Sequence, residues 1–305
     1  MNPKTLDTLP VDEKREILGL IEELNAARER ESSQGDFLEF VKRVWPAFIE
    51  GSHHRVMADA FNRIASGELK RLIVNMPPRH TKSEFASHLF PAWYLGRFPD
   101  RKVIQTAHTA ELAVGFGRKV RNLVGSEDYA RIFSGVSLSA DSKAAGRWNT
   151  NVGGDYFAIG VGGAVTGKGA DILIVDDPHS EQEAAQNDPS VYEKTYEWYT
   201  SGPRQRLQPG GAICLVMTRW SKKDLTGAIL KASIERGGSD EWEIIELPAI
   251  LPSGNPLWPG FWPLEQLEAL KAELPIGKWS AQYQQDPTSE EGAIIKREWW
   301  KEWTK

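Results

Sequence analysis

The chain has 305 residues, enough to form a large hydrophobic core in one large domain or two smaller ones. Its formal net charge of −5 argues against a uniformly basic surface for nucleic acid, although it leaves room for a local basic patch. No apolar run is long enough to span a bilayer. The single cysteine, Cys214, excludes a disulfide within the chain and fits a reducing cytoplasm. The six histidines lack the spacing of zinc ligands, so we expect no zinc site.

The first predicted element is a helix over residues 11–30, which has charged residues on most of its surface. Apolar side chains share one face of it, among them Ile17, Ile21 and Leu24. Such a face packs either on the helix's own domain or on a partner, and we expect it to pack on the domain. We assign residues 1–35 to an N-terminal helical segment.

The next feature is a short β-rich run, residues 72–75, followed by a tight turn that ends in Lys82 and Ser83 and opens a helix. This is the anatomy of a phosphate-binding loop. Backbone N–H groups and a helix N-terminus face the anion, the lysine reaches the β- and γ-phosphates, and the serine hydroxyl binds Mg²⁺. The usual glycine positions hold Met76 and Thr81. The alternative interpretation is an ordinary strand–turn–helix with a surface lysine.

A second apolar run, residues 170–175, ends in two carboxylates, Asp176 and Asp177. Runs of this kind are typical of central strands buried on both faces, and ligands bind at the carboxyl ends of such strands. In nucleoside-triphosphate hydrolases the first acid holds the Mg²⁺ shell and the next polarises the attacking water. The alternative is a strand that ends in an Asp-Asp-Pro turn.

A third apolar run, residues 212–217, ends in Thr218 and Arg219. Because parallel strands bring their carboxyl ends to one edge of a sheet, we expect these two residues on the same edge as Lys82 and Asp176. An ordinary core strand with a surface arginine is the alternative.

Strand patterns alternate with helical patterns along the chain, which predicts an α/β fold with a mostly parallel sheet covered by helices on both faces. The strands are expected at 72–75, 103–107, 156–161, 172–176, 213–218 and 242–247. Helices are expected at 84–95, 110–123 and 190–200, and a local antiparallel insertion at 147–163. We assign 36–250 to this core and 251–305, rich in Pro and Trp, to a small lid or linker with a helix near 264–274.

In this order and spacing, the segments resemble the ATPase domain of bacteriophage terminase large subunits, the motors that package viral DNA into preformed capsids. The resemblance rests on residues 75–84, 173–178, 217–220 and 279–287. It implies a P-loop NTPase of the additional-strand type that uses ATP and Mg²⁺ and couples hydrolysis to translocation of double-stranded DNA. It also implies a following nuclease domain of the ribonuclease H type. Since this chain stops near the point where that domain would begin, we expect no nuclease activity from it.

The resemblance assigns roles to single residues. It implies that Lys82 contacts the β- and γ-phosphates, that Ser83 and Asp176 hold Mg²⁺, and that Asp177 activates water, with Glu181 as the fallback. Asp177 is one methylene shorter than the usual glutamate, and Thr81 replaces a common glycine.

Further residues would complete the nucleotide site. The resemblance implies that Arg79 approaches the γ-phosphate in cis, and that Thr218 and Arg219 relay loss of this phosphate. His54 would contact adenine. The expected nucleotide-binding set is His54, Pro78, Arg79, His80, Thr81, Lys82, Ser83 and Glu84.

The resemblance also implies a homo-oligomeric ring in which a positive residue of one subunit completes the neighbour's site; the candidates are Arg147 and Lys168. It implies the terminase small subunit and the capsid portal as partners, no membrane, and the cytoplasm of an infected bacterium as the location. We interpret the best local basic cluster as a solvated helix face; it consists of Arg118, Lys119 and Arg121 with Arg97, Arg101 and Lys102.

Two other functions stay open. One is a helicase-like, nucleic-acid-dependent ATPase that acts outside packaging. The other is an assembly module that binds nucleotide weakly and catalyses nothing, which the missing loop glycine makes conceivable.

Overall fold

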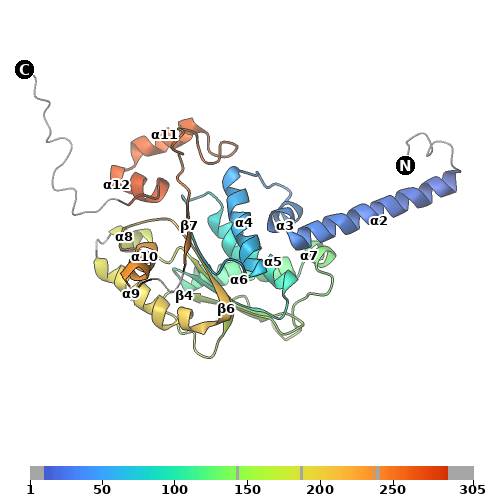
Figure 1. The fold of residues 1–305 in the computed structure, drawn as a ribbon, viewed down its shortest axis with the longest axis horizontal. Coiled ribbons are helices and arrows are strands. Elements are labelled where there is room, and N and C mark those ends of the chain that lie inside the picture. The colour runs from blue at the N-terminus through green and yellow to red at the C-terminus, as the bar shows by residue number, and fades with distance from the viewer. Residues whose placement is uncertain (1–9, 142–143, 186–187, 236, 238–240, 288–305) are drawn as a thin grey trace, which may run out of the picture.

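The computed structural model describes residues 10–141, 144–185, 188–235, 237 and 241–287. Its centre is a seven-stranded sheet with helices on both faces (Figure 1). The strands are β1 (Arg71–Asn75), β2 (Lys102–Ala107), β3 (Arg147–Asn149), β4 (Asp155–Gly160), β5 (Ala170–Asp176), β6 (Leu207–Met217) and β7 (Glu243–Glu246). Their order in the sheet is β3-β4-β2-β5-β6-β1-β7, and all are parallel except β3, which pairs antiparallel with β4. The predicted α/β class and mostly parallel sheet are therefore confirmed.

Strand β6 lies between β1 and β5, so the strand before the lysine loop does not touch the strand that ends in the acid pair. This is the additional strand that the resemblance implies. The register aligns Asn75 with Met217 and Asp176 with Val216. The carboxyl ends of the three strands consequently reach the same edge of the sheet, where ligands of open α/β sheets bind.

The helices form two layers and a lid. One face of the sheet carries α3 (Phe37–Val44), α4 (Ser52–Ser66), the π-helical η1 (Glu84–Leu89), α5 (Phe90–Arg97), α6 (Ala110–Val124) and α7 (Glu127–Ile132). The other carries α8 (Glu181–Ala185), α9 (Pro189–Ser201), η2 (Pro203–Arg206) and α10 (Leu225–Glu235). We call residues 249–287 the lid; they include α11 (Leu264–Glu273), α12 (Ile276–Lys278) and η3 (Trp279–Tyr283).

Successive side chains along each strand point to opposite faces of the sheet, which builds a hydrophobic core on each face. In β1, Leu72 and Val74 point into the first core, while Ile73 points into the second. The first core is rich in aromatic rings: Phe37 meets Phe61 edge-on, with a centroid distance of 5.2 Å. Because both faces are covered, the sheet is rigid, and its carboxyl edge is a firm base for a site.

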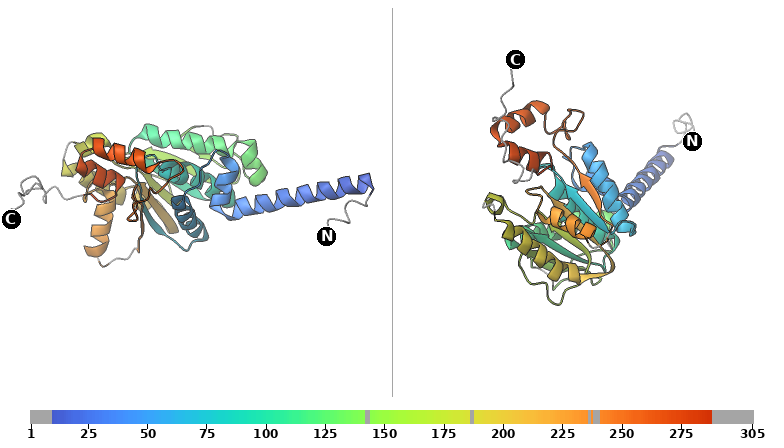
Figure 2. Two further views of the ribbon diagram at one scale, coloured as in Figure 1. Left: turned by 90° about the horizontal axis from the view of Figure 1, so that it is seen from above. Right: turned by 60° about the vertical axis from the view of Figure 1, so that its left-hand side comes forward.

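The N-terminal helix, α2 (Val11–Gly35), extends away from the body (Figures 1 and 2). Only its last turns are anchored, for example by the Trp93 indole N–H, which donates to the Ser33 carbonyl at 3.0 Å. Leu20 and Leu24 are 59% and 50% exposed. The expectation that this apolar face packs on the domain is wrong, because α3 and α4 already cover the aromatic core there.

The lid lies beyond the carboxyl edge of the sheet and has a small core of its own, in which Ala249, Leu267 and Trp279 are buried. Trp279 stacks on Tyr283 with ring centroids 4.9 Å apart. Within the described ranges, none of the helices combines the length and apolar character that a membrane span requires.

Candidate nucleotide-binding site

The loop between β1 and η1 has an unusual backbone. Arg79 and Thr81 adopt positive φ angles of 62° and 69°. L-residues with side chains pay roughly 1–2 kcal/mol for this left-handed conformation, which glycine adopts freely. Thr81 occupies the position before the lysine, so the loop keeps a glycine-like shape without the glycine.

Lys82 is the central cation of the site. Its side chain is almost fully buried, and Nζ lies 2.8 Å from Oδ2 of Asp177. A buried ammonium group needs a counter-charge, and Asp177 supplies it here. The other carboxylate oxygen of Asp177 accepts a hydrogen bond of 2.7 Å from the backbone N–H of Thr218. Asp177 therefore connects the loop to the end of β6.

Asp176 is buried next to the loop serine. Its oxygens accept hydrogen bonds from Ser83 Oγ at 2.9 Å and from Ser87 Oγ at 2.6 Å. Burial, together with the charge of Asp177, raises the pKa of the Asp176 carboxyl, while the nearby Lys82 lowers it.

These groups suit Mg²⁺, which prefers oxygen ligands and is usually bound by one or two carboxylates together with substrate phosphates. Ser83 and Asp176 supply an adjacent hydroxyl and carboxylate. Among the described residues, no group of three or more His, Cys, Asp or Glu could hold a metal ion on its own. A cation shared between protein and phosphates fits this arrangement better than a protein-only metal site.

A cavity of about 410 Å³ opens above the loop. Its floor is the loop itself, from Arg79 to Glu84, and its walls include two aromatic side chains, Trp45 and Phe261. Trp45 ends α3, and Phe261 belongs to the segment that leads into α11. Phe261 is 48% exposed and stacks on Trp258 at 4.4 Å. The cavity thus combines a phosphate-type floor with aromatic walls.

His54 lies beneath the loop and is fully buried, so the structure gives it a position different from the expected adenine contact. Its Nδ1 accepts from Gly51 N–H at 2.8 Å; Nε2 therefore carries the proton and donates to Thr81 Oγ1 at 2.6 Å. The Thr81 hydroxyl in turn donates to the His80 carbonyl at 2.5 Å. Burial lowers the pKa of His54 to about 2, which keeps the ring neutral. In this position it supports the strained Thr81.

His80 and Glu84 also face protein groups. His80 Nδ1 donates to the Pro78 carbonyl at 2.8 Å, its ring lies parallel to Trp262 of the lid, and burial lowers its pKa to about 4. Glu84 bonds to His88 at 2.6 Å and to Lys119 at 2.8 Å. These bonds hold the pKa of Glu84 near 2 against the opposing effect of burial. Both side chains shape the loop and the start of η1.

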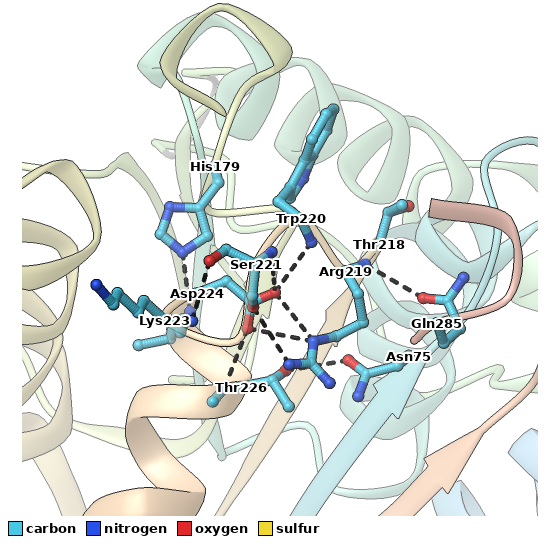
Figure 3. Close-up of polar contacts among 12 residues, drawn as sticks. Asn75, His179, Thr218, Arg219, Trp220, Ser221, Lys223, Asp224, Thr226 and Gln285 are labelled. Atoms are coloured by element: carbon cyan, nitrogen blue, oxygen red, sulfur yellow. Dashed lines mark hydrogen bonds and ion pairs between the residues drawn. The ribbon is translucent and has the colours of Figure 1, made fainter. Parts of the chain in front are cut away.

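The residues after β6 form a compact network (Figure 3). Nε of Arg219 donates to Oδ2 of Asp224 at 2.9 Å, and Asp224 is completely buried. Asp224 also accepts from the backbone N–H groups of Trp220, Ser221 and Gly227. The Arg219 backbone N–H donates to the side chain of Gln285, beyond η3 of the lid, at 3.2 Å. Thr218 thus lies beside Asp177 as expected, whereas the Arg219 guanidinium is held by protein groups.

The cavity above the loop is not lined by the candidates for completing a neighbour's site, Arg147 and Lys168, nor by the fallback water activator, Glu181. Arg147 is exposed at the start of the edge strand β3. Lys168 lies just before β5, at the sheet edge opposite the loop, and its Nζ is 2.5 Å from Asp155. Glu181 begins α8 and pairs with Lys278 of the lid at 2.9 Å. Lys168 is therefore held in place and not displayed on a free loop.

Several residues at the site escaped the sequence analysis. Ser87 lies four residues after Ser83, so helical spacing could have placed it beside Asp176. Trp45 and Phe261 have no such signal, because only the tertiary fold brings them to the cavity.

No family model matches the chain, and no curated protein is similar enough in sequence to match it. Solved structures do match. The large terminase of bacteriophage HK97 superposes with a TM-score of 0.53 at 10% identity over 78% of this chain. The chain spans about half of that protein, 51% of its length.

A second match is a mutant form of the large-terminase ATPase domain of Thermus phage P74-26, with a TM-score of 0.50 and 15% identity over 79% of this chain and 95% of that domain. A weaker match, with a TM-score of 0.45 and 8% identity over 74% of this chain and 52% of the other, is the large terminase of a thermophilic bacteriophage in complex with ADP. On the first two matches, the fold of this chain is that of phage large-terminase ATPase domains.

Proposed function

We propose that this chain hydrolyses ATP and uses the energy to translocate double-stranded DNA during viral genome packaging. One observation carries the proposal: a buried lysine and a serine bonded to a buried carboxylate meet at the carboxyl edge of an additional-strand sheet. Lys82 would contact the β- and γ-phosphates, and Ser83 and Asp176 would hold Mg²⁺, which supplies charge neutralisation of the phosphates when bound.

The ion pair between Lys82 and Asp177 suggests how binding and chemistry are linked. A triphosphate offers Lys82 a stronger anionic partner than one carboxylate, so Asp177 would be released when the nucleotide binds. The released carboxylate, still tied to the Thr218 N–H, would orient the attacking water. Glu181 is a weaker candidate, because it pairs with Lys278.

The adenine base would lie between Trp45 and Phe261. These rings line the cavity next to the loop, and base–aromatic stacking contributes about 1–3 kcal/mol per base. Arg79 is exposed and lines the same cavity, so its guanidinium would approach the phosphates from within the subunit. His54 would act through Thr81 and not through the base.

Assembly and partners follow from the packaging role. A ring would bring a cation from a neighbouring subunit, and exposed Arg147 is better placed for this than Lys168, which is paired with Asp155. Mixing Lys82→Ala protein with Arg147→Ala protein should restore some hydrolysis; no restoration at any concentration would argue for a self-sufficient site with Arg79. The small subunit, the portal and the cytoplasm of an infected bacterium complete the proposal.

The test is Mg²⁺-dependent ATP hydrolysis, measured with and without DNA. Lys82→Ala should abolish turnover, because the phosphate charge loses its main cationic partner. Asp177→Asn should reduce turnover at least about tenfold while nucleotide binding is kept or strengthened, since Lys82 no longer has a competing anion. Glu181→Gln is the matched control and should retain most activity.

The outcomes separate the alternatives. Normal turnover in Lys82→Ala would sink the phosphate-loop assignment. Absence of hydrolysis in the parent protein would instead favour an assembly module. Loss of activity in Glu181→Gln alone would transfer the water-activating role to Glu181. Strand separation in place of duplex translocation would favour a helicase-like ATPase.

A further inference from the structure

A groove of about 220 Å³ lies between α9 and α10, outside the nucleotide cavity. These helices lie side by side on the second face of the sheet (Figure 1). The groove combines three lysines with two aromatic side chains: Lys222, Lys223, Lys231, Tyr192 and Tyr196. We propose that it binds the phosphate backbone of DNA and transmits that contact to the ATP site; the second half rests on the proposed function.

The charge of the groove favours an anion. Three of its lining side chains are lysines and one, Glu193, is acidic, in a chain whose formal net charge is −5. Lys222 and Lys223 are exposed, and the Lys231 side chain is 74% exposed, with Glu235 at 3.8 Å as a distant partner. Exposed pairs of this kind are weak, so a phosphate competes with them readily.

The size and chemistry of the groove select the type of anion. Pockets for small molecules usually measure roughly 300–1,000 Å³, so about 220 Å³ accommodates a phosphate of a larger partner better than a free nucleotide. The lining has no arginine, asparagine or glutamine, whose planar groups bind base edges in a bidentate way, and its lysines act on phosphate as point charges. Contact would thus be made with the backbone and would not depend on sequence, as a motor that moves along DNA requires.

The lysines are carried by a rigid turn. The carbonyl of Lys222 lies so close to Gly227 that a Cβ added there would be 1.9 Å from its oxygen. Asp224 holds the turn from inside by accepting from the N–H groups of Trp220 and Ser221 (Figure 3). It also accepts from the Gly227 N–H, which caps α10. The backbone of Lys222 and Lys223 is therefore fixed beside the groove, and their exposed side chains extend from it.

The same turn leads directly to the ATP site. Asp224 holds the Arg219 guanidinium. Thr218, the residue before Arg219, donates its backbone N–H to Asp177. On the other side, Tyr192 packs edge-on against His179 at 5.0 Å, and His179 accepts from Leu225 N–H at 3.0 Å. A phosphate that pulls on Lys222 or Lys223 would act on a turn that is joined to the carboxylate beside Lys82 through the Thr218 N–H.

The experiment compares a triple variant, Lys222→Ala with Lys223→Ala and Lys231→Ala, with the single variant Lys194→Ala. Lys194 is exposed on α9, a helix that borders the groove, but does not line the groove, so it controls for loss of a positive charge outside it. Binding of a fluorescent DNA duplex of mixed sequence is measured by anisotropy over a range of salt concentrations. ATP hydrolysis is measured with and without the duplex.

We expect the triple variant to bind the duplex about tenfold or more weakly at low salt. The slope of log Kobs against log salt should become shallower by about 0.9 for each lysine that contacts a phosphate. Hydrolysis without DNA should match the parent protein, and stimulation by DNA should be lost. Lys194→Ala should behave as the parent in both measurements.

Unchanged affinity and salt slope in the triple variant would overturn the groove assignment, and so would an equal loss in Lys194→Ala. Binding of fluorescent polyglutamate is measured in the same anisotropy assay. If the triple variant keeps its DNA affinity but loses polyglutamate binding, the groove assignment is overturned in favour of an acidic protein. Absence of ATP hydrolysis in the parent protein would refute the proposed function and the coupling to the ATP site. It would leave the groove assignment standing, because the anisotropy measurement tests the groove without ATP.

Discussion

Thr81 keeps the phosphate-type loop in shape although glycine is missing. It has a φ of 69°, and its side chain lies in a chain of hydrogen bonds that runs from Gly51 through His54 to the His80 carbonyl. Each such bond contributes about 1 kcal/mol, comparable to the cost of the left-handed backbone. Local hydrogen bonding thus offsets the backbone strain that is expected when a residue other than glycine occupies this position.

Replacing Thr81 separates these two effects. Thr81→Ala and Thr81→Gly both remove the hydroxyl, but only glycine adopts the positive φ without strain. We expect the glycine variant to have a free energy of unfolding about 1 kcal/mol higher than the alanine variant, measured by urea denaturation. Equal stability of the two variants, or a more stable alanine variant, would show that position 81 is not strained.

Residue chemistry explains which site residues could be predicted from the sequence. Lys82, Ser83, Asp176 and Asp177 each follow a strongly apolar strand, and parallel strands must bring such ends to one edge. The position of His54 could not be predicted, because its burial depends on Phe48, Phe85 and Trp258 packing around it. Lys168 likewise resembles a mobile cation in sequence and finds Asp155 only in the fold.

At the scale of elements, strands and helices were predicted to within a few residues. The largest differences are that α3, α4 and α7 were not predicted, that β6 begins at Leu207 instead of 213, and that α2 is exposed. The period of an apolar face identifies a helix but says nothing about what covers that face. A strand that is buried on both faces of the sheet appears in the sequence as a continuous apolar run. Such a run indicates both the strand and its burial, which the apolar face of a helix does not.

The lid contacts the site at three separate points. Trp262 donates to the Arg79 carbonyl at 3.4 Å, Gln285 accepts from Arg219 N–H, and Lys278 pairs with Glu181. These contacts reach the phosphate-type loop, the residues that follow β6 and the start of α8. A lid held at all three points is well placed to respond to the nucleotide below it.

Phe261 should be the lid residue that recognises the base. Phe261→Ala is expected to weaken ADP binding about tenfold, because one stacking face is lost, and to leave pyrophosphate binding unchanged. Leu264→Ala is the matched control, since this residue is also partly exposed in the lid but does not line the cavity. Isothermal titration of all three proteins with both ligands checks this. An unchanged ADP affinity would place the base elsewhere.

At the scale of the whole molecule, buried histidines connect stability to pH. Burial lowers the pKa of His53, His80 and His179 to about 4 and that of His54 to about 2. Three of the four lie under or within the phosphate-type loop, between α4 and the lid aromatic Trp258. Folding therefore keeps neutral several groups that are protonated in the unfolded chain below about pH 6.5.

The sign of the effect follows from proton uptake. Between about pH 6.5 and pH 4 the unfolded chain binds more protons at these histidines than the folded chain, so the free energy of unfolding falls as the pH falls. Each such histidine contributes up to about 1.4 kcal/mol per pH unit. Asp176 acts in the opposite direction, because its raised pKa lets the folded state take up a proton first. Four histidines against one carboxyl leave a net loss of stability in acid.

His53→Phe tests this balance at one position. The variant keeps an aromatic ring against Trp258 and His54 but removes one group that titrates. Urea denaturation between about pH 6.5 and pH 5 should give a pH dependence shallower by close to one proton, about 1.4 kcal/mol per pH unit. At pH 7.5 and above, where His53 is neutral in both states, the comparison reports packing alone and serves as the internal control. A variant with the parent's full pH dependence would mean that His53 does not resist protonation in the folded protein. The acid sensitivity of the loop would then have to arise from His80 and His54.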